Sequence, residues 1–359
     1  MRKTMQSVLF AVLWLVLAGC AGVTGLAPNQ PAAGLVKSEQ LRNTAPSVAP
    51  ADMATLSTGN SAFAFDLYQA LRKKDGNLFY SPYSISLALA MTYAGARGET
   101  AQQMATTLHL TLPPERLHPA FDLLDLQLAQ REQGAKGTDG KGFRLNIVNA
   151  IWGQQGYQFL PDFLDTLAEN YGAGLRVLDF QKAAEPARVT INNWVDAQTE
   201  GKIKNLIPPG AIDAMTRLVL TNAIYFNAAW AQPFDKNATA DGPFTLLDGS
   251  QVTVPISSFG LAETLRDLGM RDAFSPGTAD FSGMTGNRDL FIGAVIHKAY
   301  VSVDEAGTEA AAATAVIMPA SAMPAEPLRV NVDRPFVFLI RDMETGTVLF
   351  VGRVLNPST

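Results

Sequence analysis

The 359-residue chain contains a single cysteine, Cys20, and three histidines. One cysteine excludes an intramolecular disulfide and the paired cysteines of structural zinc sites. The chain also lacks a nucleophile elbow, a phosphate-binding P-loop and the helical H-E-x-x-H motif of metalloproteases. These absences argue against an enzyme, and we expect neither a metal nor another cofactor.

An excess of positive charge is missing as well. The chain has 28 Lys and Arg against 33 Asp and Glu, which gives a formal net charge of −5, and it has no long basic block. Because nucleic acids are bound through basic surfaces, a nucleic-acid partner is not expected. Hydrophobic residues make up 47% of the chain, enough to fill one large core or two smaller ones.

A long apolar run occurs at the N-terminus, where Arg2 and Lys3 precede the uninterrupted apolar residues 8–18. At a helical rise of about 1.5 Å per residue, this run covers about half of a hydrocarbon core of about 30 Å. It is therefore too short for a retained membrane helix. The pattern predicts a secretory signal peptide over residues 1–19.

The Leu-Ala-Gly sequence before Cys20 resembles a bacterial lipobox, in which the cysteine is lipidated and becomes the new N-terminus. The alternative is a chance cysteine at the end of an ordinary signal peptide. Four prolines punctuate the small and polar residues from 21 to 53, without apolar periodicity. We therefore expect residues 20–53 to form a flexible, lipid-anchored tether of an exported protein.

The rest of the chain, residues 54–359, predicts an α+β fold, since helical patterns come mostly early and strand patterns mostly late. Asn60 and Ser81 are the expected caps of the first two helices, which end at Gly76 and Gly95. Further helices are expected at 99–108, 115–130, 161–171 and 187–200. Strands are expected at 143–151 (half-buried), 218–226, 290–303, 335–340 and 347–354, the last two as a hairpin.

The three histidines do not indicate a catalytic site. His109 and His118 flank Pro113 and Pro114 in a polar connection, and we expect both to be solvated surface residues. His297 lies on an expected strand whose alternate positions are apolar. We expect it to be buried and hydrogen-bonded in a structural role.

The segment around residues 308–316 allows two conformations. It is rich in alanine and could form a short helix, but about eleven residues without an apolar face are marginal as a helix in water. With a period of two, alternate residues from Thr308 to Val316 place small uncharged side chains on one face, and Glu309 lies on the other. Such a face could enter a sheet without burying an unpaired charge.

This segment resembles the hinge of inhibitory serpins almost letter for letter. By resemblance the hinge residues are Gly307, Thr308, Glu309, Ala310, Ala311, Ala312, Ala313 and Thr314. Other motifs follow in the family's order: a shutter helix at 77–84, a central strand at 221–226 and a C-terminal hairpin at 333–338 and 350–357. The likeness covers residues 54–359.

The resemblance assigns further residues. Ser81 and Ser84 lie in the shutter motif, and Asn222 and His297 match the pair that hydrogen-bonds across the closed central sheet. Trp230 matches the tryptophan of the breach. The implied fold packs helices on a central mixed sheet that carries a mobile reactive loop.

One part of the serpin pattern is missing. Only residues 256–260 separate the segment 251–255 from the segment 261–265. Serpins have about 60 more residues between the matching segments, about half of a typical domain. By resemblance the loss includes three strands of the second sheet and the outermost strand of the central sheet. The second sheet should then be incomplete, and we expect the hairpin to expose four apolar side chains: Phe336, Phe338, Leu349 and Phe350.

The resemblance implies a monomeric inhibitor, not an enzyme. A serine protease attacks its loop, forms a covalent complex and is trapped when the loop inserts into the sheet. Two alternatives remain open. In the first, the chain is a non-inhibitory or folding-defective lipoprotein that binds a partner. In the second, it is a hydrolase with an unrecognised site.

The sequence of the loop limits the target. No Lys or Arg occurs between Glu305 and Leu328, so a trypsin-like pocket finds no cation to bind. By serpin spacing from the hinge, the attacked bond is expected at Ser321-Ala322, with Ala320 beside it. Such small side chains favour the shallow pockets of elastase-like or subtilisin-like enzymes.

Overall fold

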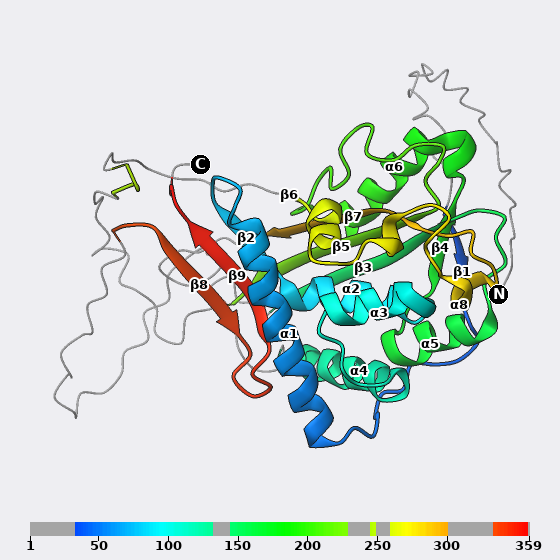
Figure 1. Ribbon diagram of the computed structural model, residues 1–359, viewed down its shortest axis with the longest axis horizontal. Coiled ribbons are helices and arrows are strands. Elements are labelled where there is room, and N and C mark those ends of the chain that lie inside the picture. The colour runs from blue at the N-terminus through cyan, green and yellow to red at the C-terminus, as the bar shows by residue number, and fades with distance from the viewer. Residues whose placement is uncertain (1–32, 132–143, 229–244, 249–258, 301–332, 358–359) are drawn as a thin grey trace, which may run out of the picture. The chain divides into compact units, whose positions relative to one another are not determined.

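The structure is a computed structural model that describes residues 33–131, 144–228, 245–248, 259–300 and 333–357, all within the compact unit Pro31–Thr359. Its helices are α1 (Pro50–Leu71), α2 (Pro82–Tyr93), α3 (Gly98–Thr107), α4 (Pro114–Gln130), α5 (Pro161–Tyr171), α6 (Phe180–Gln198), α7 (Ala262–Asp267) and α8 (Ser282–Thr285). Its strands are β1 (Gly34–Val36), β2 (Leu78–Tyr80), β3 (Arg144–Gln154), β4 (Leu175–Leu178), β5 (Leu218–Asn227), β6 (Phe259–Gly260), β7 (Ile292–Tyr300), β8 (Phe336–Arg341) and β9 (Val348–Val354) (Figure 1). The expected α+β class is confirmed.

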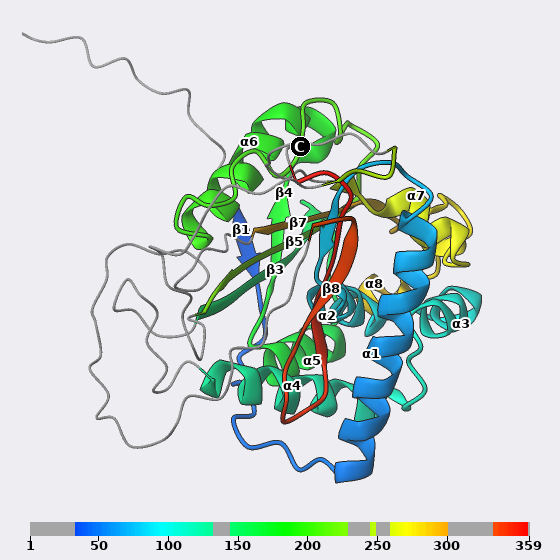
Figure 2. The ribbon, with the colours of Figure 1, turned by 90° about the vertical axis from the view of Figure 1, so that its left-hand side faces the viewer.

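Six of the described strands form the larger sheet in the order β1-β4-β3-β5-β7-β6. The sheet is mixed, since β3 runs antiparallel to β5, and β5 runs parallel to β7. Helix α6 covers one face, and α2 packs on the other (Figure 2). With both faces covered, all ten residues of β5 are buried. β3 is half-buried from Arg144 to Asn149, as expected for the strand at 143–151, but Ala150 and Ile151 are buried, and burial on both faces continues to Gln154.

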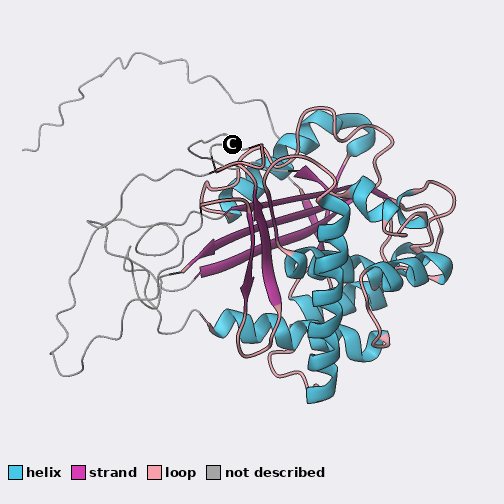
Figure 3. Ribbon diagram, turned by 60° about the vertical axis from the view of Figure 1, so that its left-hand side comes forward, coloured by secondary structure: helices cyan, strands magenta, loops and turns pink. Residues whose placement is uncertain are grey.

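The smaller sheet has the order β2-β9-β8 among the described residues, and α1 packs against β9 (Figure 3). The expected hairpin of β8 and β9 is confirmed. Because α1 and α2 pack against β9, Leu349 and Phe350 are buried, and Phe350 stacks on Phe79 with 5.1 Å between ring centroids. Their expected exposure is therefore wrong.

The edge strand β8 carries the apolar exposure instead. Phe336 and Phe338 are partly buried, whereas Val337 and Leu339 on the opposite face are 51% and 46% exposed. At the edge of the larger sheet, the two residues of β6 pair with Ile296 and His297 of β7. The loss of the outermost strand was expected. Two described residues of an edge strand are nevertheless present.

Four of the six predicted helices begin within one residue of the expected start and two begin earlier, while the short helices α7 and α8 were not predicted. Helix α6 starts at Phe180, earlier than expected, because the Asp179 carboxylate caps it and accepts a hydrogen bond from the Lys182 N–H. Helix α1 starts at Pro50, a residue suited to the first turn of a helix. Asn60 therefore lies inside α1, where its amide donates to the Val348 carbonyl at 3.1 Å.

The segment before α1 is folded onto the domain. Strand β1 pairs antiparallel with β4, and the Asn43 N–H donates to the Glu169 carbonyl of α5 at 2.9 Å. The Arg42 guanidinium pairs with Asp122 at 2.8 Å and Asp125 at 2.7 Å, both on α4. The expectation of a flexible tether over residues 20–53 is therefore wrong for residues 33–53, because strand pairing and a half-buried ion pair hold them.

Arg42 gives a test of this docking. The Asp122 side chain is fully buried, and burial raises the pKa of its carboxyl while Arg42 lowers it. Arg42→Ala leaves that carboxylate without its cation, so we expect the free energy of unfolding in urea to fall by about 3 kcal/mol. A combined Arg42→Ala and Asp122→Asn variant should recover part of the loss.

A matched control is Arg116→Ala, which removes a more exposed arginine that pairs with Asp52 at 3.5 Å. We expect a loss of about 0.5 kcal/mol for that change. Equal, small losses for Arg42→Ala and Arg116→Ala would show that Arg42 does not dock the segment.

Candidate functional site at the β5–β7 junction

The site begins at the N-terminus of α2. Every residue of this helix from Pro82 to Thr92 is buried, so the backbone N–H groups of its first turn are cut off from water. Ser81 caps the helix, as the sequence predicts, and its hydroxyl accepts a hydrogen bond from the Ser84 N–H at 3.1 Å. The first turn thus enters the apolar core with its polar groups paired, which buried donors require.

Two strands of the larger sheet supply the rest of the site. Asn222 of β5 lies opposite His297 of β7 in the parallel pairing, and opposite Asn149 of β3 in the antiparallel one. The Asn222 amide nitrogen donates toward the Ser84 carbonyl at 2.8 Å, the Ser84 hydroxyl at 2.5 Å and the Asn149 side-chain oxygen. One amide therefore ties two strands to the start of α2.

The hydrogen bonds of His297 fix its protonation state. Its Nε2 accepts from the Ser81 backbone N–H at 3.1 Å, so the single proton of the neutral ring lies on Nδ1. Nδ1 then donates to the Asn222 side-chain oxygen. His297 is 2% exposed, and burial lowers its pKa to about 3. A second proton would direct Nε2–H at the Ser81 N–H, so the site requires neutral imidazole.

The structure brings Ser81, Ser84, Asn222 and His297 together in one buried cluster. Asn149 belongs to the same cluster and was not predicted. The available signal was its polar side chain in the alternating apolar series of the strand at 143–151. Outside the described residues lie the other predicted site residues: Cys20, Trp230, the hinge Gly307 to Thr314, and Ala320, Ser321 and Ala322.

The two strands that meet at this cluster are bonded directly to each other. Their parallel register runs from Leu218 opposite Ile292 to Tyr225 opposite Tyr300, with one irregularity after Leu218. By resemblance, Asn222 and His297 on these strands are the pair that hydrogen-bonds across the closed central sheet. The sheet is therefore closed at this position, and Asn222 and His297 bond across the closure.

The other two histidines lie elsewhere. His109 is partly exposed and pairs with Asp66 at 2.7 Å. His118 is only 5% exposed, and its Nδ1 lies 2.7 Å from the Tyr171 hydroxyl. The expectation that His118 is solvated is wrong, because its position on α4 turns it inward against α5.

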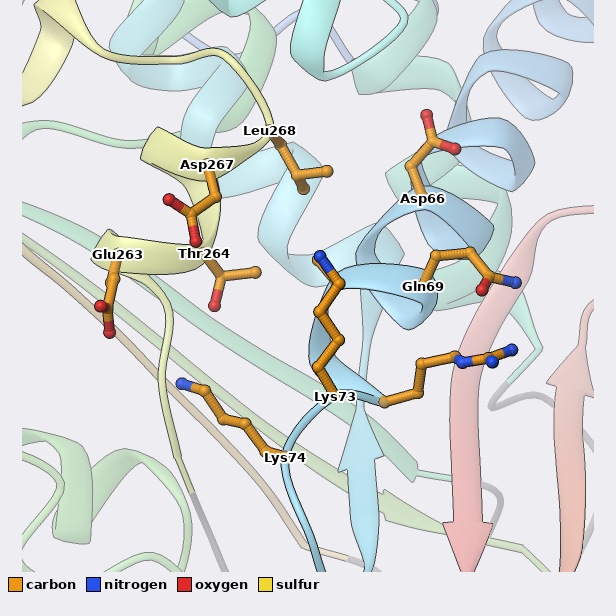
Figure 4. A pocket seen from close by; sticks show the side chains of 10 residues that line it. Asp66, Gln69, Lys73, Lys74, Glu263, Thr264, Asp267 and Leu268 are labelled. Carbon is orange, nitrogen blue, oxygen red and sulfur yellow. The ribbon is translucent and has the colours of Figure 1, made fainter.

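A groove of about 590 Å3 separates the end of α1 from α7 (Figure 4). Lys73 and Lys74 extend into it from one side, and Glu263 and Asp267 line the other. No ion pair joins these four side chains to any described residue. No described helix is long and apolar enough to cross a bilayer.

Comparison with known proteins identifies the class. The family model of serpins, serine protease inhibitors, matches residues 58–258 and 256–357. The leukocyte elastase inhibitor of Homo sapiens is 36% identical over 390 residues, which cover 85% of this chain and 100% of the relative. The same values hold for leukocyte elastase inhibitor A of Rattus norvegicus. The chain belongs to the serpin family.

Solved structures agree on the fold. Tengpin, a thermophilic serpin in its native state, has a TM-score of 0.73 at 25% identity and covers 90% of this chain and 99% of its own. Uncleaved ovalbumin has a TM-score of 0.71 at 23% identity, and the match covers 84% of this chain and 100% of the ovalbumin chain. The alignment with the human relative is longer than the whole chain, as expected if an internal segment is missing near residues 256–260.

The buried cluster predicts a pH dependence of stability. The folded-state pKa of His297, about 3, lies below the value of about 6.5 in an unfolded chain. As the pH falls below about 6.5, the unfolded state binds a proton that the folded state does not, so the free energy of unfolding falls. The slope reaches about 1.4 kcal/mol per pH unit for each such histidine.

His118, whose pKa burial lowers to about 4, contributes with the same sign. Urea unfolding of the wild type and of His297→Gln, measured between about pH 7 and about pH 5.5, avoids most carboxylate titration. We expect the variant to show about half the wild-type slope. Equal slopes would contradict the assignment of a neutral, buried His297.

Proposed function

We propose that the protein inhibits an extracytoplasmic serine protease by trapping it after the loop is cleaved. The observation that carries the proposal is the closed junction of β5 and β7, with Asn222 bonded to His297 across it. The protease serine would attack a loop carbonyl carbon, an ester would form and the amine half of the peptide would leave with a proton. The freed N-terminal part of the loop would then enter between β5 and β7.

The sequence of the hinge suits that route. β5 is buried at every position, so a strand placed beside it enters an apolar layer covered by helices on both faces. Alternate residues from Thr308 to Val316 carry no charge, and their side chains are small. Insertion would break the Asn222–His297 bond, and new backbone bonds on both sides of the added strand would offset that loss.

An elastase-like or subtilisin-like protease is the proposed target. Two of the relatives are leukocyte elastase inhibitors by name, and the loop of this chain offers Ala320, Ser321 and Ala322 where cleavage is expected. Incubation with elastase, subtilisin and trypsin in turn tests this. A band that contains protease and survives boiling in detergent is expected with the first or second enzyme, together with a new N-terminus at Ser321 or Ala322.

Other results would redirect the proposal. Cleavage without any stable band favours the non-inhibitory, partner-binding alternative. Rapid trapping of trypsin at Arg329, or cutting by elastase only outside residues 316–325, contradicts the assigned bond. Turnover of a chromogenic ester by the protein alone would favour the hydrolase.

The hinge gives a sharper test. We expect Thr308→Arg to convert the inhibitor into a substrate, because a guanidinium at the first inward position would enter the sheet without a partner and slow insertion. Deacylation is then faster than loop insertion, and the loop is cut without a stable complex. Thr308→Val, which keeps the size and adds no charge, is the matched control and should still trap protease. Undiminished trapping by Thr308→Arg would falsify the insertion route.

We also propose that Cys20 anchors the exported protein to a bacterial membrane through lipid. A single acyl chain binds only reversibly, so stable anchoring requires the several chains that lipobox cysteines carry. Cys20→Ser should move the protein from the membrane to the soluble fraction after cell fractionation. An unchanged membrane fraction would show that Cys20 is not the anchor.

A further inference from the structure

A cleft of about 900 Å3 lies between the segment before α1 and the helices α2 to α5. It is remote in sequence from the β5–β7 junction, and the proposed inhibition does not involve it. Its wall combines residues of five segments: Leu41 and Asn43; Tyr93, Ala94, Ala96 and Arg97; Gly98 and Ala101; Pro114, Glu115, His118 and Pro119; and Thr166, Glu169 and Asn170. The volume lies within the range of small-molecule sites.

His118 presents one ring nitrogen to this cleft. The Tyr171 hydroxyl makes no other hydrogen bond to a described residue, so its proton is paired only if it donates to His118 Nδ1. Burial keeps His118 neutral at pH values well above 4, since it lowers the pKa to about 4. The ring proton then lies on Nε2, which has no partner among the described residues and is not among the buried unpaired atoms. The cleft thus contains an unpaired N–H donor on a side chain that is 95% buried.

Arg97 adds a fixed cation. Its Nη1 donates to the Ala94 carbonyl at 2.9 Å and the Ala96 carbonyl at 2.7 Å, which holds the guanidinium in place. Its guanidinium packs against Gly283, where a Cβ would meet Cζ at 2.3 Å, and its Nε and Nη2 make no hydrogen bond or ion pair with a described residue. Helices α3 and α4 also begin at this cleft without a side-chain cap, which adds the positive ends of two helix dipoles.

Glu115 and Glu169 supply negative charge on the same wall, and neither forms an ion pair with a described residue. Burial raises the pKa of Tyr93; Arg97 opposes this shift and Glu115 adds to it, so both charges lie near the phenol. Arg97 and Glu115 nevertheless do not pair with each other. Residues of opposite charge therefore line the cleft without pairing with each other.

We propose that this cleft binds a small zwitterion, an amino acid or a short peptide, with its carboxylate at Arg97 and His118 Nε2 and its ammonium group at Glu115. An anion alone would meet two carboxylates, and a cation alone would leave the guanidinium and the His118 N–H unpaired. A zwitterion satisfies both sets. The apolar side chain of the ligand would cover Leu41, which is 87% exposed.

The test uses the full chain and four probes: leucine, the dipeptide Leu-Leu, N-acetyl-leucine without an ammonium group, and leucine amide without a carboxylate. At about 10 mM, leucine or Leu-Leu should raise the midpoint of thermal unfolding by about 2 °C or more. The two blocked compounds should bind at least about tenfold more weakly. No shift with either zwitterion, or equal binding of a blocked compound, overturns the proposal.

Variants and a local signal locate the site. Arg97→Gln and Glu115→Gln should each weaken binding by about tenfold or more. Arg334→Gln, at an exposed arginine whose partner among the described residues is its neighbour Asp333, is the matched control and should leave binding unchanged. Arg97→Gln could loosen the turn that Arg97 supports. If the Arg97→Gln variant unfolds, the binding measured for Glu115→Gln decides the test.

The imidazole of His118 reports the contact directly. A bound carboxylate at Nε2 should raise the pKa of His118 above its starting value of about 4, as followed by NMR titration. Binding that leaves the His118 signals unchanged would place the ligand elsewhere and overturn the assignment.

Discussion

The hydrogen bond between Asn222 and His297 is the constraint on which the central architecture depends. It joins β5 to β7, and through Ser81 and Ser84 it joins both strands to the buried start of α2. Separating the strands would leave the Asn222 oxygen and the Ser81 N–H unpaired in apolar surroundings. Each such orphan costs about 1–3 kcal/mol, so the strands and the helix hold one another in register.

The shortened part of the chain adjoins this constraint, since Phe259 of β6 lies opposite His297, yet it leaves the junction of β5 and β7 paired. Strands β3, β5 and β7 keep their pairing on both sides of the junction, and α2 and α6 still cover the two faces. In the smaller sheet, β9 stays between β2 and β8, with Phe350 against Phe79 and Phe226. The apolar exposure therefore falls on β8, where an edge strand can carry it without opening the core.

The sequence predicted local patterns better than partners that are distant in the chain. Helix α5 was predicted to the residue, since its apolar period and first-turn proline are local signals. Asn60 was taken as a cap because its partner, the Val348 carbonyl, lies 288 residues away. His118 was taken as solvated because its partner, Tyr171, lies on another helix. Ser81, Ser84, Asn222 and His297 were grouped by family resemblance, and no spacing rule would have joined them.

The two buried histidines show why burial alone does not define a role. Both are neutral, and in both burial lowers the pKa by placing the charged ring in an apolar environment. In His297, both ring nitrogens are bonded within the protein, so the ring holds secondary structure together and has no capacity for a ligand. In His118, Nδ1 alone is bonded to a described residue, and the other nitrogen lies beside a cleft with an arginine on its wall. The number of ring nitrogens that are hydrogen-bonded within the protein, more than the depth of burial, distinguishes a structural histidine from one that can bind a ligand.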